Sequence, residues 1–283
     1  MPASPKIIKK HEEMFYPTVR IRAKGSGGSG TVVYSKKHHG EYHTYVITNH
    51  HVVSRCIQVE KRWNPVRKRK MDTEILDTVY VEYFKYNNYS HCIGSFAIEA
   101  DIVAYSEVDG GQDWALLRVR DKENPAHYVA NLFPEHDIEN VHIFDPCYAV
   151  GASLGHAPIA PNGHICYKDD EISHYRYWMS TAQTIFGNSG GALYRYSDER
   201  KDYEYIGIPS RITVQPMGFS RDPITHMGYF IPIERVYNLL RDNNYHFIFD
   251  DAMSFEECAK LRGEEVPDLF DIDPDDDEDE NEE

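Results

Sequence analysis

The sequence has no long hydrophobic run and no recognisable leader. None of its apolar stretches approaches the roughly 20 residues that a membrane-spanning helix needs. The first ten residues, Met-Pro-Ala-Ser-Pro-Lys-Ile-Ile-Lys-Lys, carry charges but lack the apolar core of a secretory signal. We therefore expect no membrane partner and a location in the cytoplasm, with association with a virion or another particle left open.

Cysteine is scarce, and its spacing suits neither disulfides nor metal. The five cysteines are odd in number, widely scattered and without a C-x-x-C pair. Without a leader, they are expected to be reduced thiols. Fifteen histidines are many, but no thiolate or carboxylate partner at a fixed spacing defines a metal geometry. The sequence predicts no metal site and no cofactor.

The C-terminal segment contains no basic residue at all. Residues 264–283 hold thirteen Asp or Glu; subtracting these from the net charge of −16 leaves −3 for the rest of the chain. A segment of this composition cannot bury enough apolar surface to fold. Residues 250–283 are therefore predicted to be a short helix followed by a disordered acidic tail.

Three roles for this tail are open. It could keep the protein soluble, or it could dock on a protein partner through the apolar residues of Val266-Pro-Asp-Leu-Phe-Asp-Ile272. It could also dock on Lys61-Arg-Trp-Asn-Pro-Val-Arg-Lys-Arg-Lys70, where six of ten residues are basic. That basic run could itself meet an acidic substrate or nucleic acid. The overall acidity and the single Trp63 argue against nucleic acid, and an exposed hairpin tip is the simpler interpretation.

Short β-rich segments separated by Gly or polar turns predict an all-β fold of sandwich or barrel type. One set lies within residues 15–126, after an N-terminal extension at 1–14, and a second set lies within 127–249. Two helices are expected near the end. Ile233–Leu240 has apolar residues at helical spacing, and Ser254-Phe-Glu-Glu257 has the form of a capping box.

Three segments carry the residues of a possible nucleophilic site, each at a strand edge. Gly187-Asn-Ser-Gly-Gly191 places Ser189 between glycines, which permit a tight turn. A serine needs a basic partner, usually a histidine oriented by a carboxylate. Thr48-Asn-His-His-Val-Val53 and Asp113-Trp-Ala-Leu-Leu117 supply both, in the chain order His, Asp, Ser. Together they predict acyl-transfer chemistry.

These three motifs resemble those of trypsin-like serine proteases, most closely the HtrA-type branch. Further similar segments, such as Gly25–Val33 and Val150–Gly155, extend the resemblance over about residues 17–242. It implies two six-stranded antiparallel β-barrels with a terminal helix and a cleft between the barrels. It assigns the catalytic role to His51 rather than His50. The stretch between His51 and Asp113 is long, so an inserted loop or hairpin is expected. Too few residues follow the terminal helix for the PDZ domain usual in that branch.

The resemblance also implies roles around the triad of His51, Asp113 and Ser189. The backbone N–H groups of Gly187 and Ser189 would form an oxyanion hole. Ser210 would lie near Asp113. The substrate pocket would have Gln183 at its base with Thr184 beside it, and walls that include Ser210, Arg211 and Ile212. No aspartate stands at the base, which disfavours cleavage after Lys or Arg.

Asn188 marks a departure from the digestive branch of that family, which has an aspartate before the nucleophile. A neutral amide cannot pair with a newly cut, charged N-terminus, so we expect no activating cleavage. The function predicted is a serine endopeptidase that acts on protein or peptide substrates. The alternative is a catalytically silent peptide-binding or particle-associated assembly protein with the same fold.

Overall fold

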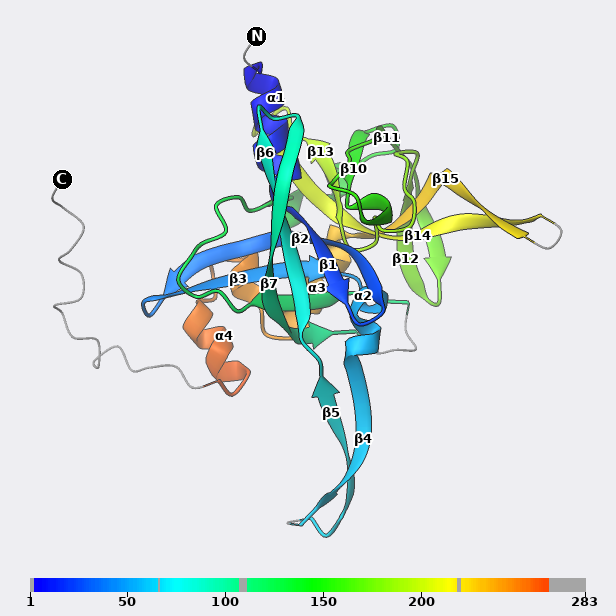
Figure 1. Cartoon of the computed structure of the whole chain (residues 1–283). Coiled ribbons are helices and arrows are strands. Elements are labelled where there is room, and N and C mark those ends of the chain that lie inside the picture. The colour runs from blue at the N-terminus through cyan, green and yellow to red at the C-terminus, as the bar shows by residue number, and fades with distance from the viewer. Residues whose placement is uncertain (1–2, 66, 107–110, 218–219, 265–283) are drawn as a thin grey trace, which may run out of the picture.

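Antiparallel strands dominate the chain, in two closed groups that follow one another along the sequence. The computed structural model describes residues 3–65, 67–106, 111–217 and 220–264. The predicted acidic tail from residue 265 lies outside them. The first group closes into a barrel in the order β1-β2-β3-β8-β7-β6 (Figure 1). Its strands are β1 (Thr18–Ala23), β2 (Ser26–His38), β3 (Glu41–Thr48), β6 (Val79–Asn87), β7 (His91–Tyr105) and β8 (Ala115–Val119).

The second group is a sheet that curls into a ring through the extra pairing of β13 with β14. Its six antiparallel strands are β10 (Pro146–Val150), β11 (Asn162–Ile172), β12 (Tyr175–Ser180), β13 (Ala192–Tyr196), β14 (Tyr203–Met217) and β15 (Ser220–Pro232). The short β9 (Asn131–Leu132) adds a parallel edge to β14. The two rings confirm the predicted fold of two six-stranded barrels.

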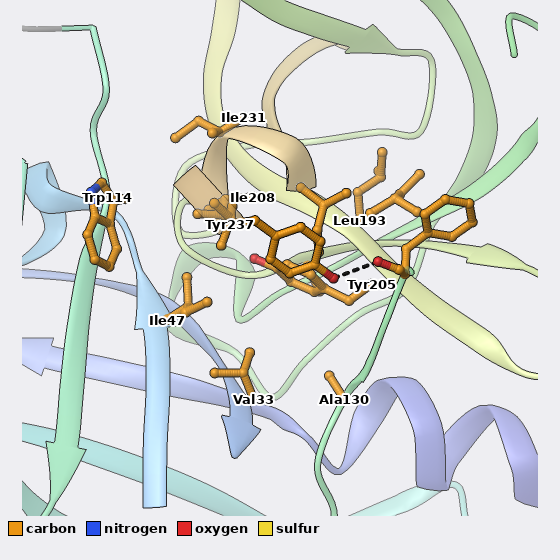
Figure 2. Packing of buried hydrophobic residues seen from close by; sticks show 14 of the residues in the cluster. Val33, Ile47, Trp114, Ala130, Leu193, Tyr205, Ile208, Ile231 and Tyr237 are labelled. Carbon is orange, nitrogen blue, oxygen red and sulfur yellow. Dashed lines mark hydrogen bonds between the residues drawn. The ribbon is translucent and has the colours of Figure 1, made fainter. Parts of the chain in front are cut away.

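The barrels share one of the two hydrophobic cores. Val33, Ile47 and Trp114 of the first barrel and Leu193 and Ile208 of the second belong to one buried cluster (Figure 2). Tyr237 of the C-terminal helix also packs there, and its hydroxyl donates to the carbonyl of Phe133 at 2.5 Å. A separate cluster fills the first barrel. The shared core fixes the two barrels against each other and so fixes whatever lies at their junction.

Short helices sit at the ends of the chain and at two strand ends. They are α1 (Pro5–Lys10), α2 (His50–Val53), α3 (Ile233–Asp242) and α4 (Phe255–Leu261), with single turns at η1 (His11–Phe15), η2 (Ser54–Cys56), η3 (Glu135–Asn140), η4 (Ser153–Gly155) and η5 (His246–Ile248). Helix α3 buries its apolar stripe, and α4 opens with the predicted capping box: Glu257 N–H donates to Ser254 Oγ at 3.1 Å. The N-terminal helical turns were not predicted. Within the described ranges, no helix has the length and apolarity to cross a membrane.

The long stretch after His51 forms the expected insertion. Strands β4 (Ile57–Asn64) and β5 (Arg69–Leu76) pair only with each other, as a two-stranded sheet. This hairpin projects away from the first barrel beside α2 (Figure 1). It is called the arm below.

Candidate active site

His51 and Asp113 meet because they stand at the ends of paired neighbouring strands. Strand β3 ends at Thr48, which pairs with Ala115 at the start of β8. His51 follows on the first turn of α2, while Asp113 stands two residues before Ala115. The Nδ1 atom of His51 lies 2.9 Å from Oδ2 of Asp113 and 3.0 Å from Oδ1. The His51 side chain is 50% exposed and that of Asp113 only 11%. The pair therefore joins a half-exposed imidazole to a largely buried carboxylate.

Hydrogen bonds keep this buried carboxylate ionised. Burial acts to raise the pKa of Asp113, but hydrogen bonds from the side chains of His51 and Ser210 outweigh it, and the pKa is lowered. Ser210 Oγ donates to Asp113 Oδ2 at 2.6 Å, and the His51 backbone N–H donates to Oδ1 at 3.0 Å. An ionised carboxylate at Nδ1 holds the imidazole with Nε2 free to accept a proton.

The backbone at Asp113 is itself unusual and is held by residues of the second barrel and α3. Asp113 has φ = 51°, the left-handed region that aspartate enters more easily than most residues. Just before it, the Gly111 carbonyl accepts from the Tyr177 hydroxyl and, at 3.0 Å, from Nη2 of Arg235. The Arg235 guanidinium lies 4.8 Å from the Tyr177 ring, and burial lowers its pKa. Helix α3 thus braces the segment that carries the carboxylate.

The turn around Ser189 leaves two backbone N–H groups without a partner among the described residues. Gly187 has φ = 99°, and a Cβ there would lie 2.6 Å from Leu154 N. The carbonyl of Phe186 accepts from Leu154 N–H at 2.8 Å. Because C=O and N–H point in opposite directions across a trans peptide, the Gly187 N–H points away from Leu154. Among hydrogen bonds of the described residues, none uses the N–H of Gly187 or of Ser189. Both donors are available to a ligand.

Ser29, on β2 of the first barrel, fastens this turn. Its Oγ donates to the Gly187 carbonyl at 2.6 Å and accepts from Ala152 N–H at 2.7 Å. Its backbone N–H donates to the Ser189 carbonyl at 2.8 Å. A Cβ at Gly190 would lie 2.3 Å from the Ser29 carbonyl. Sequence reasoning missed this residue; the only signal was a serine between glycines in an otherwise β-rich segment.

The side-chain oxygen of Asn188 has neutral hydrogen-bond partners, whereas its Nδ2 is buried with no partner among the described residues. Its side chain is buried, and Oδ1 accepts from Ser153 Oγ at 2.5 Å and from Ile185 N–H at 3.3 Å. A neutral hydroxyl, rather than a charged group, therefore contacts the Asn188 side chain. The arrangement supports, but does not itself test, the expectation that no activating cleavage occurs.

A family model for the trypsin-like peptidase domain matches residues 28–200, well over half of the chain. The chain belongs to the trypsin-like peptidase family. One similar solved structure is the HtrA-type protease AlgW with a tripeptide, with a TM-score of 0.56 and 17% sequence identity over 84% of this chain. Another is a serine-to-alanine variant of AlgW with a tripeptide, with a TM-score of 0.55 and 17% identity over 83% of this chain. A serine endoprotease from Yersinia pestis is also similar, with a TM-score of 0.52 and 18% sequence identity over 86% of this chain.

At these identities the likeness shows a shared fold. This chain spans 63% and 62% of the lengths of the two AlgW chains and 67% of the Yersinia pestis chain. Among curated proteins, no sequence matches it.

A pocket of about 260 Å³ opens at the junction of the two halves of this peptidase domain. It is lined by His51, Thr184, Ile185, Phe186, Asn188, Ser189, Pro209, Ser210, Arg211 and Ile212. The strands therefore bring Ser189 and His51 to one cavity, together with four of the five residues expected to form a substrate pocket. No hydrogen bond among the described residues joins the Ser189 hydroxyl to His51. The hydrogen bond between a nucleophile and its base is often long in an enzyme that has no substrate bound.

Gln183 is the exception and corrects the expected pocket base. It is exposed and does not line the pocket, whereas Thr184 is buried. Residues 181–184 alternate between exposed and buried, as an extended segment does, so Gln183 and Thr184 point opposite ways. Thr184 Oγ1 is buried with no hydrogen-bond partner among the described residues and would lie 2.2 Å from a Cβ at Gly228. Thr184 lines the pocket, and Gln183 does not.

His50 lies apart from this chemistry. It is buried and does not line the pocket, and its ring stacks on that of Tyr105 with 5.6 Å between the ring centroids. Burial lowers the pKa of His50.

Within the described ranges, no group of three or more His, Cys, Asp or Glu is arranged to hold a metal ion.

Proposed function

We propose that this trypsin-like peptidase domain is an active serine endopeptidase with the triad Ser189, His51 and Asp113. The observation that carries the proposal is the shared pocket: Ser189 and His51 line it together, while Asp113 holds the other side of the imidazole at 2.9 Å. No single strand supplies this set, so its assembly depends on the fold.

In the first half-reaction, Ser189 Oγ attacks the carbonyl carbon of the scissile peptide bond and His51 Nε2 takes the hydroxyl proton. Asp113 stabilises the imidazolium and keeps Nδ1 as the hydrogen-bond donor. The N–H groups of Gly187 and Ser189 hold the negative oxygen of the tetrahedral intermediate. His51 then protonates the leaving amine as the C–N bond breaks, which leaves an acyl group on Ser189.

In the second half-reaction, a water molecule loses a proton to His51 and attacks the acyl carbon. The ester bond breaks, and the proton passes back to Ser189 as the new carboxyl end departs. Apart from the substrate and this water molecule, the steps use only groups of the chain itself.

For specificity, we propose a small or medium apolar side chain in the pocket. The pocket is small, and Ile185, Ile212 and Thr184 give it mainly apolar walls. Arg211 is exposed at the same pocket, and its guanidinium lies 5.5 Å from the Tyr177 ring. Cleavage of a peptide library identifies the preference; enrichment of acidic residues at the cut would instead assign the selectivity to Arg211.

A fluorophosphonate probe tests the nucleophile directly. The wild-type protein is expected to become labelled, and Ser189→Ala is expected to remain unlabelled with the same melting temperature. Ser90→Ala is a matched control, because Ser90 is an exposed serine between β6 and β7 that does not line the pocket. A wild-type protein that is folded but takes no label would favour the silent peptide-binding alternative.

A further inference from the structure

The arm is the part of the described structure with the least support from its surroundings. Strands β4 and β5 pair with each other and with no other described strand. A lone two-stranded hairpin has marginal stability in water. Trp63 is 62% exposed and Val59 is 60% exposed. Large apolar side chains in the open, on a projecting ribbon, indicate a surface that something covers.

The charge of the arm indicates what covers it. From Ile57 to Leu76 there are six Lys or Arg and three Asp or Glu, a net charge of +3 in a chain of net charge −16. Arg62 is paired with Glu60 at 3.2 Å. Lys68, Arg69 and Lys70, in contrast, form no ion pair within the described ranges. Trp63 lies directly across the ladder from Lys70, so the exposed ring and the unpaired cations are neighbours.

The same chain carries a segment of complementary chemistry. Residues 265–283 contain twelve Asp or Glu, no Lys or Arg, and the apolar residues Val266, Leu269, Phe270 and Ile272. The last described residue, Glu264, follows α4, which packs on the first barrel through Phe255, 4.2 Å from the ring of His38. The arm grows from that same barrel (Figure 1).

Geometry allows the two to meet within one molecule. The nineteen residues after Glu264 can span up to about 60 Å when extended. A tethered segment has an effective concentration on the order of millimolar, which favours it over free acidic competitors. The rest of the chain has a net charge of only −4.

We propose that residues 265–283 dock on the arm of their own chain. In this contact the carboxylates lie against Lys68, Arg69 and Lys70, and an apolar side chain covers Trp63. The arm begins six residues after His51, directly beyond α2 and η2. The docked tail would lie toward the far end of the arm, where Trp63 pairs with Lys70, and would exclude other acidic polypeptides from that surface. The docking itself does not depend on peptidase activity.

Tryptophan fluorescence provides the test, because the three tryptophans differ sharply in exposure. Trp114 and Trp178 are buried at 0% and 1%, whereas Trp63 is 62% exposed. Quenching by neutral acrylamide therefore reports mainly on Trp63. We expect the full chain to have a quenching constant at least about twofold lower than a variant ending at Glu264 at low salt. The two should converge at about 1 M salt, where screening is nearly complete.

Charge reversal separates this contact from a general effect of the tail. Lys68→Glu/Arg69→Glu/Lys70→Glu in the full chain should quench like the truncated variant. The matched control Lys36→Glu/Lys37→Glu, on exposed residues of β2, should keep the protection. Equal quenching of full and truncated chains at low salt would overturn the proposal. Protection that grows with protein concentration would show docking between copies and would overturn docking within one chain. Protection that appears only when a DNA duplex is added would assign the arm to nucleic acid instead.

Discussion

The Asp113 corner and the Ser189 turn are the two halves of the proposed active site, and they are held in place by different forces. The Asp113 corner is ionic: a buried carboxylate with a lowered pKa is bonded by His51 and Ser210, with the Arg235 cation behind it. The Ser189 turn is neutral and depends on glycine geometry and on hydrogen bonds of the backbone and of Ser29.

Each half is nevertheless braced by the opposite barrel. Asp113 precedes β8 of the first barrel, but Ser210 and Tyr177 come from β14 and β12 of the second. Ser189 belongs to the second barrel, but Ser29 comes from β2 of the first. Neither barrel alone contains all the bonds that orient its own half-site. The geometry of the site therefore depends on how the two barrels pack against each other.

The largest effect is expected from removing the charge of the ionic half. Asp113→Asn should lower kcat by about 10⁴-fold, because a neutral amide can stabilise the wrong tautomer of His51 and cannot stabilise its charged form. Labelling kinetics with a fluorophosphonate and turnover of a peptide ester measure the loss. A decrease below about tenfold would show that Asp113 does not orient the base.

The next effect tests the neutral half. Ser29→Ala leaves the Gly187 carbonyl and the Ala152 N–H without their partner, at a cost of about 2 kcal/mol in the free energy of unfolding. Loosening of the oxyanion-hole turn should also lower kcat, by up to about 10²-fold. The loss should be equal across the pH range, since no ionisable group changes. Ser35→Ala on the same strand is the matched control, because Ser35 Oγ bonds Thr44 and Ala126, far from the turn.

Much of this arrangement was predictable from local sequence, and the cross-barrel bonds were not. Short β-rich segments between turns predicted the strands, and strand-end motifs predicted His51, Asp113 and Ser189 as neighbours. The capping box at Ser254 was also confirmed, since it depends on only four residues. Ser29 and Arg235 act across 158 and 124 residues of sequence, and their partners are backbone carbonyls with no side-chain signature. Gln183 was misplaced because counting residues from Ser189 does not determine which face of an extended segment points inward.

A smaller effect is expected from the brace behind the ionic half. Arg235→Met keeps much of the apolar contact with Tyr175 and Tyr177 but removes the hydrogen bonds to the Gly111 and Gln112 carbonyls. Without them, Asp113 should lose part of its fixed orientation, with kcat/KM falling about tenfold and KM nearly unchanged. The control Arg241→Met, on the same helix, removes a more exposed pair with Glu135. Equal losses in both variants would indicate a general weakening of α3.

The smallest effect is a difference between the two halves in how the melting temperature depends on pH. Asp113 has a lowered pKa in the folded protein, so its ionised form contributes stability above the ordinary pKa of about 3.9, and this is lost as the pH falls through the folded value. Ser210→Ala removes one of the bonds that lower this pKa. The folded value should therefore move upward toward the ordinary one, and the acid-induced fall in melting temperature should begin at higher pH than in the wild type. Ser29→Ala, which touches only neutral groups, should lower the melting temperature by the same amount at pH 3 and pH 7. If the Ser210→Ala curve ran parallel to the wild type, Ser210 would be a packing contact and the ionic half would depend on His51 alone.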